Sequence, residues 1–214
     1  MKYKYKFKEI EGFENGLIID LPKEIKTVSA FLTEIKDKEI GEWYIEGIDL
    51  VIKDKSEYEE RFGECYGVKI KKAMTHVLSS FQDCGIADNC YIETEELKNL
   101  ILVWMEELNK YKEKKEIEYN KKLNVFIEKV IKPNEDFRNA LLKLINKLLG
   151  LRFSKARTIQ KKNYTITVCS YTVHIRDSSC EDNNINDFNI SPQDLKEIII
   201  KTNEQKEKGI DLIY

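Results

Sequence analysis

The sequence predicts an α+β fold: a strand-rich N-terminal half closed by a long amphipathic helix, then a smaller helix-hairpin-helix α+β unit. Three observations support this class. Apolar and polar residues alternate in several segments before residue 80, helical periodicity dominates after Thr94, and β-branched segments follow a second helix that begins near Asn134. The 214 residues are enough for one large or two small domains.

Charge divides the chain into two parts. Residues 1–115 contain 19 basic and 24 acidic side chains, a net charge of −5, whereas residues 116–214 contain 17 and 14, a net charge of +3. Such asymmetry between halves is typical of two functional units. We therefore predict an acidic strand-rich domain with a closing helix over 1–115 and a basic α+β domain over 116–214.

The strands of the first half are predicted from alternation and turn residues. "YKYKFKEI" (3–10) and "LIIDL" (17–21) predict a hairpin, and "EWYIEGIDLVI" (42–52) and "YGVKIKKAM" (66–74) predict further strands. The segment "TVSAFLTEIK" (27–36) fits a strand or a helix. A strand is favoured, because the residues that follow it can form a turn back into Trp43.

The closing helix has the clearest pattern. Thr94 can cap its start, two glutamates follow, and apolar residues recur at spacings of three and four: Leu97, Leu100, Ile101, Trp104, Leu108 and Tyr111. The chain contains no Gly or Pro between Gly85 and Pro133. The helix therefore either continues through Val130 or breaks in the charged run at residues 115–120.

The second half begins with the helix "NEDFRNALLKLINKLLG" (134–150), with Asn134 as its cap and Gly150 as its stop. "ARTIQ" (156–160) and "YTITVCSYTVHIR" (164–176) predict a hairpin, and residues 177–189 predict a polar loop. Ser191 and Pro192 then begin a last helix, "SPQDLKEIIIKTNEQK".

The sequence contains no recognisable catalytic constellation. It has only two histidines, His76 and His174, and lacks a Gly-rich phosphate loop, a nucleophile elbow and a His-Glu-x-x-His helix. A PD-(D/E)xK nuclease pattern that starts at Asp49 fails, because the next strand has Gly67 and Val68 where an acid is needed. These absences favour a protein that is not an enzyme.

No metal and no cofactor are predicted either. The five cysteines are an odd number, and Cys84 and Cys90 have five residues between them and no second pair to complete a zinc site. Free thiols are therefore expected. The chain has no apolar run of about 18–20 residues that could span a bilayer, and "MKYKYKFKEIEGF" has no apolar signal-peptide core. We expect no membrane association and a cytoplasmic location.

The best local signal for a binding surface is a basic window. Between Phe137 and Arg176 the chain has nine Lys or Arg and no Asp or Glu. The predicted partner-binding residues are Lys143, Lys147, Arg152, Lys155, Arg157, Lys161 and Lys162. Clustered cations attract an acidic protein or nucleic acid, and Tyr164 and Tyr171 could stack on bases. The alternative is an ordinary solvated surface.

The stretch from "GEWYIEGIDLVI" to "DNCYIETEELKNLILVWMEE", about residues 40–112, resembles the small immunity proteins that accompany Gram-positive polymorphic toxins. The resemblance implies a cytosolic, strand-rich protein with a closing helix that occludes the active site of a cognate toxin. The leading hypothesis is therefore a non-enzymatic binding or inhibitor protein of immunity or anti-defence type. The alternative is a nucleic-acid-binding protein or unusual nuclease that uses the basic C-terminal half.

Overall fold

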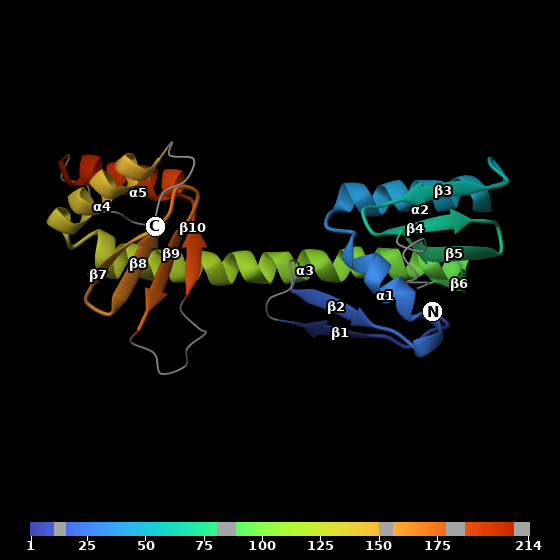
Figure 1. Cartoon of the computed structure of the whole chain (residues 1–214). Helices are drawn as coiled ribbons and strands as arrows, with labels where there is room; N and C mark the ends of the chain where they lie inside the picture. Colours follow the sequence, from blue (N-terminus) through green and yellow to red (C-terminus); the bar gives the residue numbers. More distant parts are fainter. Residues whose placement is uncertain (11–15, 81–88, 150–155, 179–186, 208–214) are drawn as a thin grey trace. The chain divides into compact units, whose positions relative to one another are not determined.

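The computed structural model describes residues 1–10, 16–80, 89–149, 156–178 and 187–207. The chain divides into two compact units, unit 1 (Met1–Lys114) and unit 2 (Lys115–Tyr214). Helices and antiparallel sheets occur in both units, which confirms the α+β class (Figure 1). Among the helices of the described residues, none has both the length and the apolar character that crossing a membrane requires.

Unit 1 combines a hairpin, a four-stranded sheet and three helices. Its elements are β1 (Lys6–Glu9), β2 (Leu17–Asp20), a 3-10 turn η1 (Lys23–Ile25), α1 (Lys26–Thr33), α2 (Lys38–Ile52), β3 (Glu59–Phe62), β4 (Tyr66–Ile70), β5 (Met74–Ser79), β6 (Asn89–Glu93) and the first part of α3 (Thr94–Phe126). The predicted β1–β2 hairpin is confirmed, with Phe7 opposite Ile19. The larger sheet has the strand order β3-β4-β5-β6, and its neighbours are all antiparallel.

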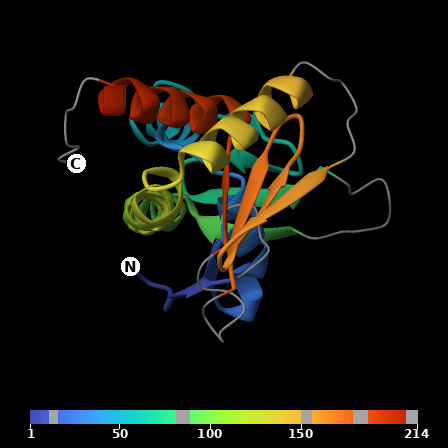
Figure 2. The ribbon, with the colours of Figure 1, turned by 90° about the vertical axis from the view of Figure 1, so that its left-hand side faces the viewer.

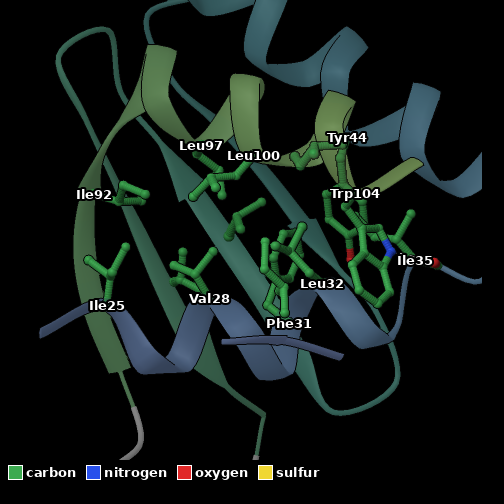
Figure 3. Close-up of a cluster of buried hydrophobic side chains, with 14 of the residues drawn as sticks. Ile25, Val28, Phe31, Leu32, Ile35, Tyr44, Ile92, Leu97, Leu100 and Trp104 are labelled. Atoms are coloured by element: carbon green, nitrogen blue, oxygen red, sulfur yellow. Dashed lines mark hydrogen bonds between the residues drawn. The ribbon is translucent and has the colours of Figure 1, made fainter. Parts of the chain in front are cut away.

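All helices of unit 1 pack on one face of this sheet. Inward side chains such as Val68, Val77 and Ile92 join α1, α2 and α3 in a single core. Figure 3 shows residues of α1 and α3 pointing toward one another in this core. Trp104 of α3 is fully buried, and its Nε1 donates a hydrogen bond to the carbonyl of Ile35 at 3.0 Å.

Two strand predictions in unit 1 are wrong. Residues 42–52 lie in the helix α2, and residues 27–36, for which a strand was favoured, lie mostly in the helix α1. The buried positions of α2 follow helical spacing: Gly41, Tyr44, Gly47, Ile48 and Val51. The Asp37 side chain caps α2 by accepting a hydrogen bond from the Ile40 amide at 2.9 Å. Tertiary burial of one helical face thus overrides the β-propensity of Ile, Val and Tyr.

The helix α3 is continuous from Thr94 to Phe126 and leads into a π-helical turn, η3 (Ile127–Ile131), so it does not break at residues 115–120 (Figure 1). Thr94 is its first residue, but its hydroxyl donates to the carbonyl of Lys71 at 2.6 Å. The apolar stripe up to Leu108 belongs to the core of unit 1, and Phe126 belongs to the core of unit 2. Between them, residues 112–118 are exposed on every side of the helix.

Unit 2 contains a four-stranded antiparallel sheet of order β10-β9-β8-β7. Its elements after η3 are α4 (Glu135–Leu148), β7 (Arg157–Lys161), β8 (Tyr164–Val168), β9 (Val173–Asp177), β10 (Phe188–Ile190) and α5 (Pro192–Glu207). Figure 2 shows α4 and α5 side by side over the sheet. The predicted helix starts are confirmed near Asn134 and at Pro192, and Ser191 accepts a hydrogen bond from the Asp194 amide at 3.0 Å.

The strands of unit 2 differ from the predicted hairpin. Residues 164–176 form two strands, because the chain reverses at Cys169–Thr172, where the Cys169 amide donates to the Thr172 carbonyl at 2.8 Å. Phe188 and Ile190, predicted to lie in or beside a polar loop, are buried in β10. The predicted helix stop at Gly150 lies outside the described residues.

Candidate functional site

The face of the β3–β6 sheet that points away from the unit 1 helices carries an unusual set of side chains. Alternation along each strand sends one set inward to the core and the other set outward. One outward row runs straight across the sheet through Glu60, Lys69, His76 and Tyr91, which are paired in register. This face therefore presents aromatic and charged groups together, on a rigid element of the fold.

These outward side chains surround an open hollow of about 570 Å³. We call it the aromatic hollow, and its lining includes Tyr58, Lys69, Lys71, Met74, His76 and Tyr91. The His76 and Tyr91 rings are stacked, with centroids 4.4 Å apart and an angle of 9° between their planes. Tyr91 is 62% exposed, and Tyr58 and Met74 are also exposed. Such an exposed apolar group on a sheet face is the kind of surface that a partner can cover.

Polar contacts hold part of this lining in place. The Tyr58 hydroxyl donates to Glu60, and burial and then this contact raise the pKa of Tyr58 to about 12, so the phenol stays protonated at neutral pH. The His76 Nε2 lies 3.3 Å from Asn89 Oδ1, and Lys69 Nζ lies 3.7 Å from Glu60 Oε1. Among the described residues, none forms an ion pair or hydrogen bond with the Lys71 ammonium. The aromatic hollow thus contains one cation available to a ligand.

The residues of the predicted basic surface have mixed environments. Lys143 and Lys147 are exposed on α4, and Arg157 is exposed on β7. Arg152 and Lys155 lie outside the described residues. In the same window, Arg138 is fully buried: its guanidinium donates to Asn203 Oδ1 and to the carbonyls of Ile131 and Lys132.

Lys161 lies near an aromatic ring, and Lys162 shares a hollow with acidic residues. The Lys161 ammonium lies 6.0 Å from the centre of the Phe137 ring. Lys162, in a left-handed turn with φ of 52°, lines a hollow that also contains Glu128 and Asp177. Acids from outside the basic window therefore share this hollow with Lys162.

The structure gives no support for a catalytic role of His174. It lies on the uncovered face of the unit 2 sheet, with its Nε2 3.5 Å from Asp187 Oδ2, and Arg176 Nε contacts the same oxygen at 3.2 Å. Across the described ranges, His, Cys, Asp and Glu form no group of three or more that could hold a metal. Cys90 is a buried free thiol, and Cys84 is outside the described residues.

The sequence reasoning missed the aromatic hollow. Its signal was present in "NCYIE", where Tyr91 occupies the outward position between the inward Cys90 and Ile92. An aromatic residue in the polar phase of a strand is informative, because that phase usually carries solvated side chains. His76 was considered alone, without its cross-strand partner Tyr91, because the register of β5 and β6 is set by the fold.

Comparison with known proteins gives one informative relationship. No family model matches the chain. No solved structure matches it either. An immunity protein of Bacillus cereus is 37% identical over 116 residues, which are 54% of this chain and 96% of the relative. Since this similarity extends over nearly the whole relative, the chain belongs to the family of that immunity protein.

Proposed function

We propose that this chain is an immunity protein that neutralises a toxin by binding it, as a cytoplasmic inhibitor without catalytic activity of its own. The observation that carries the proposal is the 37% identity to almost the entire Bacillus cereus immunity protein. Neutralisation by occlusion needs a complementary surface and no reacting groups. The uncovered sheet face of unit 1 offers such a surface.

The length of the match supports an assignment of this function to unit 1. Unit 2 spans residues 115–214, which is 214 − 114 = 100 residues, fewer than the 116 matched. The match must therefore include part of unit 1. Because unit 1 is itself 114 residues long, close to the matched length, we assign the toxin-neutralising role to unit 1.

A growth assay tests the proposal. A candidate toxin domain from the genome that encodes this chain is expressed in a bacterial host, with and without the chain. We expect growth arrest by the toxin alone and restored growth when the chain is present. Arrest that persists despite full expression of the chain would show that the proposed function is wrong.

A binding measurement separates protein capture from nucleic-acid binding. Purified chain and toxin domain are mixed after nuclease treatment and analysed by size-exclusion chromatography with light scattering. A one-to-one complex that survives the nuclease supports the inhibitor. A complex that disappears with the nuclease supports the alternative, in which the basic residues of unit 2 bind nucleic acid.

A further inference from the structure

We propose that the aromatic hollow is the toxin-docking surface, and that it accepts an acidic segment of the toxin carrying an aromatic or aliphatic anchor side chain. This inference rests on the proposed function and adds the surface and the chemistry of the partner. It is carried by three independent observations: exposed apolar groups, their fixed geometry, and a local charge opposite to that of the surrounding unit.

The first observation is the apolar area that docking would remove from water. Tyr58, Met74 and Tyr91 are all exposed and line the same hollow, while the opposite face of the sheet is buried in the core. Covering such side chains gives a free-energy gain proportional to the apolar area buried. Tyrosine is also prominent among the residues that dominate binding energy at protein interfaces.

The second observation is that the rings are already held in place. Tyr91 is stacked on His76, its cross-strand neighbour, and the Tyr58 hydroxyl is held by Glu60. Side chains that are ordered before binding lose little further conformational entropy in the complex. The aromatic hollow is therefore preorganised: its side chains have their positions before a partner binds.

The third observation is the sign of the local charge. The charged lining residues are Lys69 and Lys71, and the nearest acid, Glu60, borders the hollow beside Lys69. Yet residues 1–115 as a whole carry a net charge of −5. An acidic segment is therefore attracted to the two lysines of the hollow, which orients docking.

The arrangement also predicts the contacts within the complex. The anchor side chain packs against the Tyr91 and Tyr58 rings, and a carboxylate beside it pairs with the Lys71 ammonium. Lys71 is suited to this role, because within the described part of the chain its ammonium forms no ion pair or hydrogen bond. Lys69 is less available, because it lies 3.7 Å from Glu60.

Two substitutions test the proposal, each with a matched control. Tyr91→Ala removes the most exposed ring of the hollow, and Tyr171→Ala removes an 80% exposed tyrosine of unit 2. Lys71→Glu reverses the available cation, and Lys121→Glu reverses an exposed lysine on α3. Circular dichroism and melting curves establish that each variant is folded. Affinity for the purified toxin domain is then measured by calorimetry at low and high salt.

We expect Tyr91→Ala and Lys71→Glu each to weaken binding about tenfold or more, and both controls to stay within about twofold of wild type. High salt should reduce the effect of Lys71→Glu but not that of Tyr91→Ala, since salt screens charges and leaves apolar burial intact. In a charge swap, Lys71→Glu should regain affinity for a toxin variant in which the contacting acid is replaced by lysine.

The outcomes distinguish this inference from the proposed function. If wild type protects cells and both hollow variants bind and protect equally well, the docking surface is wrong and the immunity function stands. If wild type gives no protection, both proposals fail. Binding of a duplex oligonucleotide that Lys71→Glu abolishes would replace the acidic protein partner with nucleic acid and overturn the inference.

Discussion

The two units contain the same kind of sheet but carry different side chains on the face that points away from their helices. Each places a four-stranded antiparallel sheet against helices on one face and leaves the other face without helices from its own core. In unit 1 that face presents Tyr58, Met74 and Tyr91. In unit 2 it presents mainly threonines, with His174 and Arg176.

The polar groups of the unit 2 face largely satisfy one another. Thr158 and Thr167 pair through their hydroxyls at 3.2 Å, and Asp187 contacts both His174 and Arg176. Covering these groups would require loss of their hydration without a compensating apolar gain. The comparison teaches that exposure alone does not identify a docking surface. What matters is whether the outward side chains of the strands are apolar or are polar groups that already bind one another.

The largest expected effect is a loss of stability in unit 2 that leaves the stability of unit 1 unchanged. Arg138→Ala leaves the carbonyls of Ile131 and Lys132 and the Asn203 amide oxygen without their buried donor. We expect a loss of about 3 kcal/mol in the stability of unit 2, which corresponds to roughly 10 °C or more in its melting transition.

Differential scanning calorimetry checks this prediction, and toxin affinity gives the second readout. Because the two cores have no residue in common, we propose that the units unfold independently. Only one of two transitions should then shift, and toxin binding by unit 1 should persist. A single transition that shifts as a whole would contradict independent units.

A smaller effect is expected from the basic residues of unit 2. The double substitution Lys161→Glu and Lys162→Glu reverses two charges of the predicted basic surface, but Glu128 and Asp177 already lie beside Lys162. We expect toxin affinity to change less than about twofold, in contrast to Lys71→Glu in unit 1. Calorimetric titration under the same conditions measures both.

If the double variant of Lys161 and Lys162 lost more affinity than Lys71→Glu, and lost it in a salt-dependent way, the proposed docking surface would be wrong. Such a loss would show that the basic window, and not the aromatic hollow, is the docking surface. Lys121→Glu is again the matched control, since it changes the net charge at an exposed helical position.

The smallest expected effect concerns acid stability at the edge of the unit 1 sheet. A hydrogen bond from Lys2, together with one from Tyr3, lowers the pKa of Glu93 from 4.5 to about 2. This carboxylate therefore stabilises unit 1 above its unfolded pKa, and the contribution is lost as pH falls through the folded value.

Melting temperatures between pH 7 and pH 2 check this prediction. Glu93→Gln should melt slightly below wild type at pH 7, and the difference should shrink as pH falls from about 4.5 toward 2. A difference that is the same at every pH would mean that the glutamine disturbs packing rather than removing a charge contact.

Sequence periodicity predicted the helices α3, α4 and α5 well and the helices α1 and α2 poorly. The stripe from Leu97 to Leu108 identified α3, because many positions agree on one face. The strand prediction for α2 failed, because Ile, Val and Tyr favour strands locally while its burial follows helical spacing. The glycines of α2 are explained only by its packing. A Cβ at Gly41 would meet Met105 of α3, and a Cβ at Gly47 would meet Arg61 of β3.

The break between β8 and β9 could have been found in the sequence. The buried residues Tyr164, Ile166 and Val168 occupy even positions, whereas Val173 and Ile175 occupy odd ones. A single strand cannot change phase in this way, so the shift itself marks a turn. For the site, charge counting along the chain favoured the basic window, because it cannot place Lys71 in one hollow with the rings of Tyr58, His76 and Tyr91.

The bare stretch of α3 at residues 112–118 has a consequence for how such a protein can evolve. Ile117 there is 69% exposed, and neither hydrophobic core includes a residue of this stretch. Selection on these positions is then limited to keeping a helix, which many sequences can do. A genetic crossover within this stretch would cut through neither core. The gene can therefore exchange its second half at this point without dividing the core of unit 1, to which we assign the immunity function.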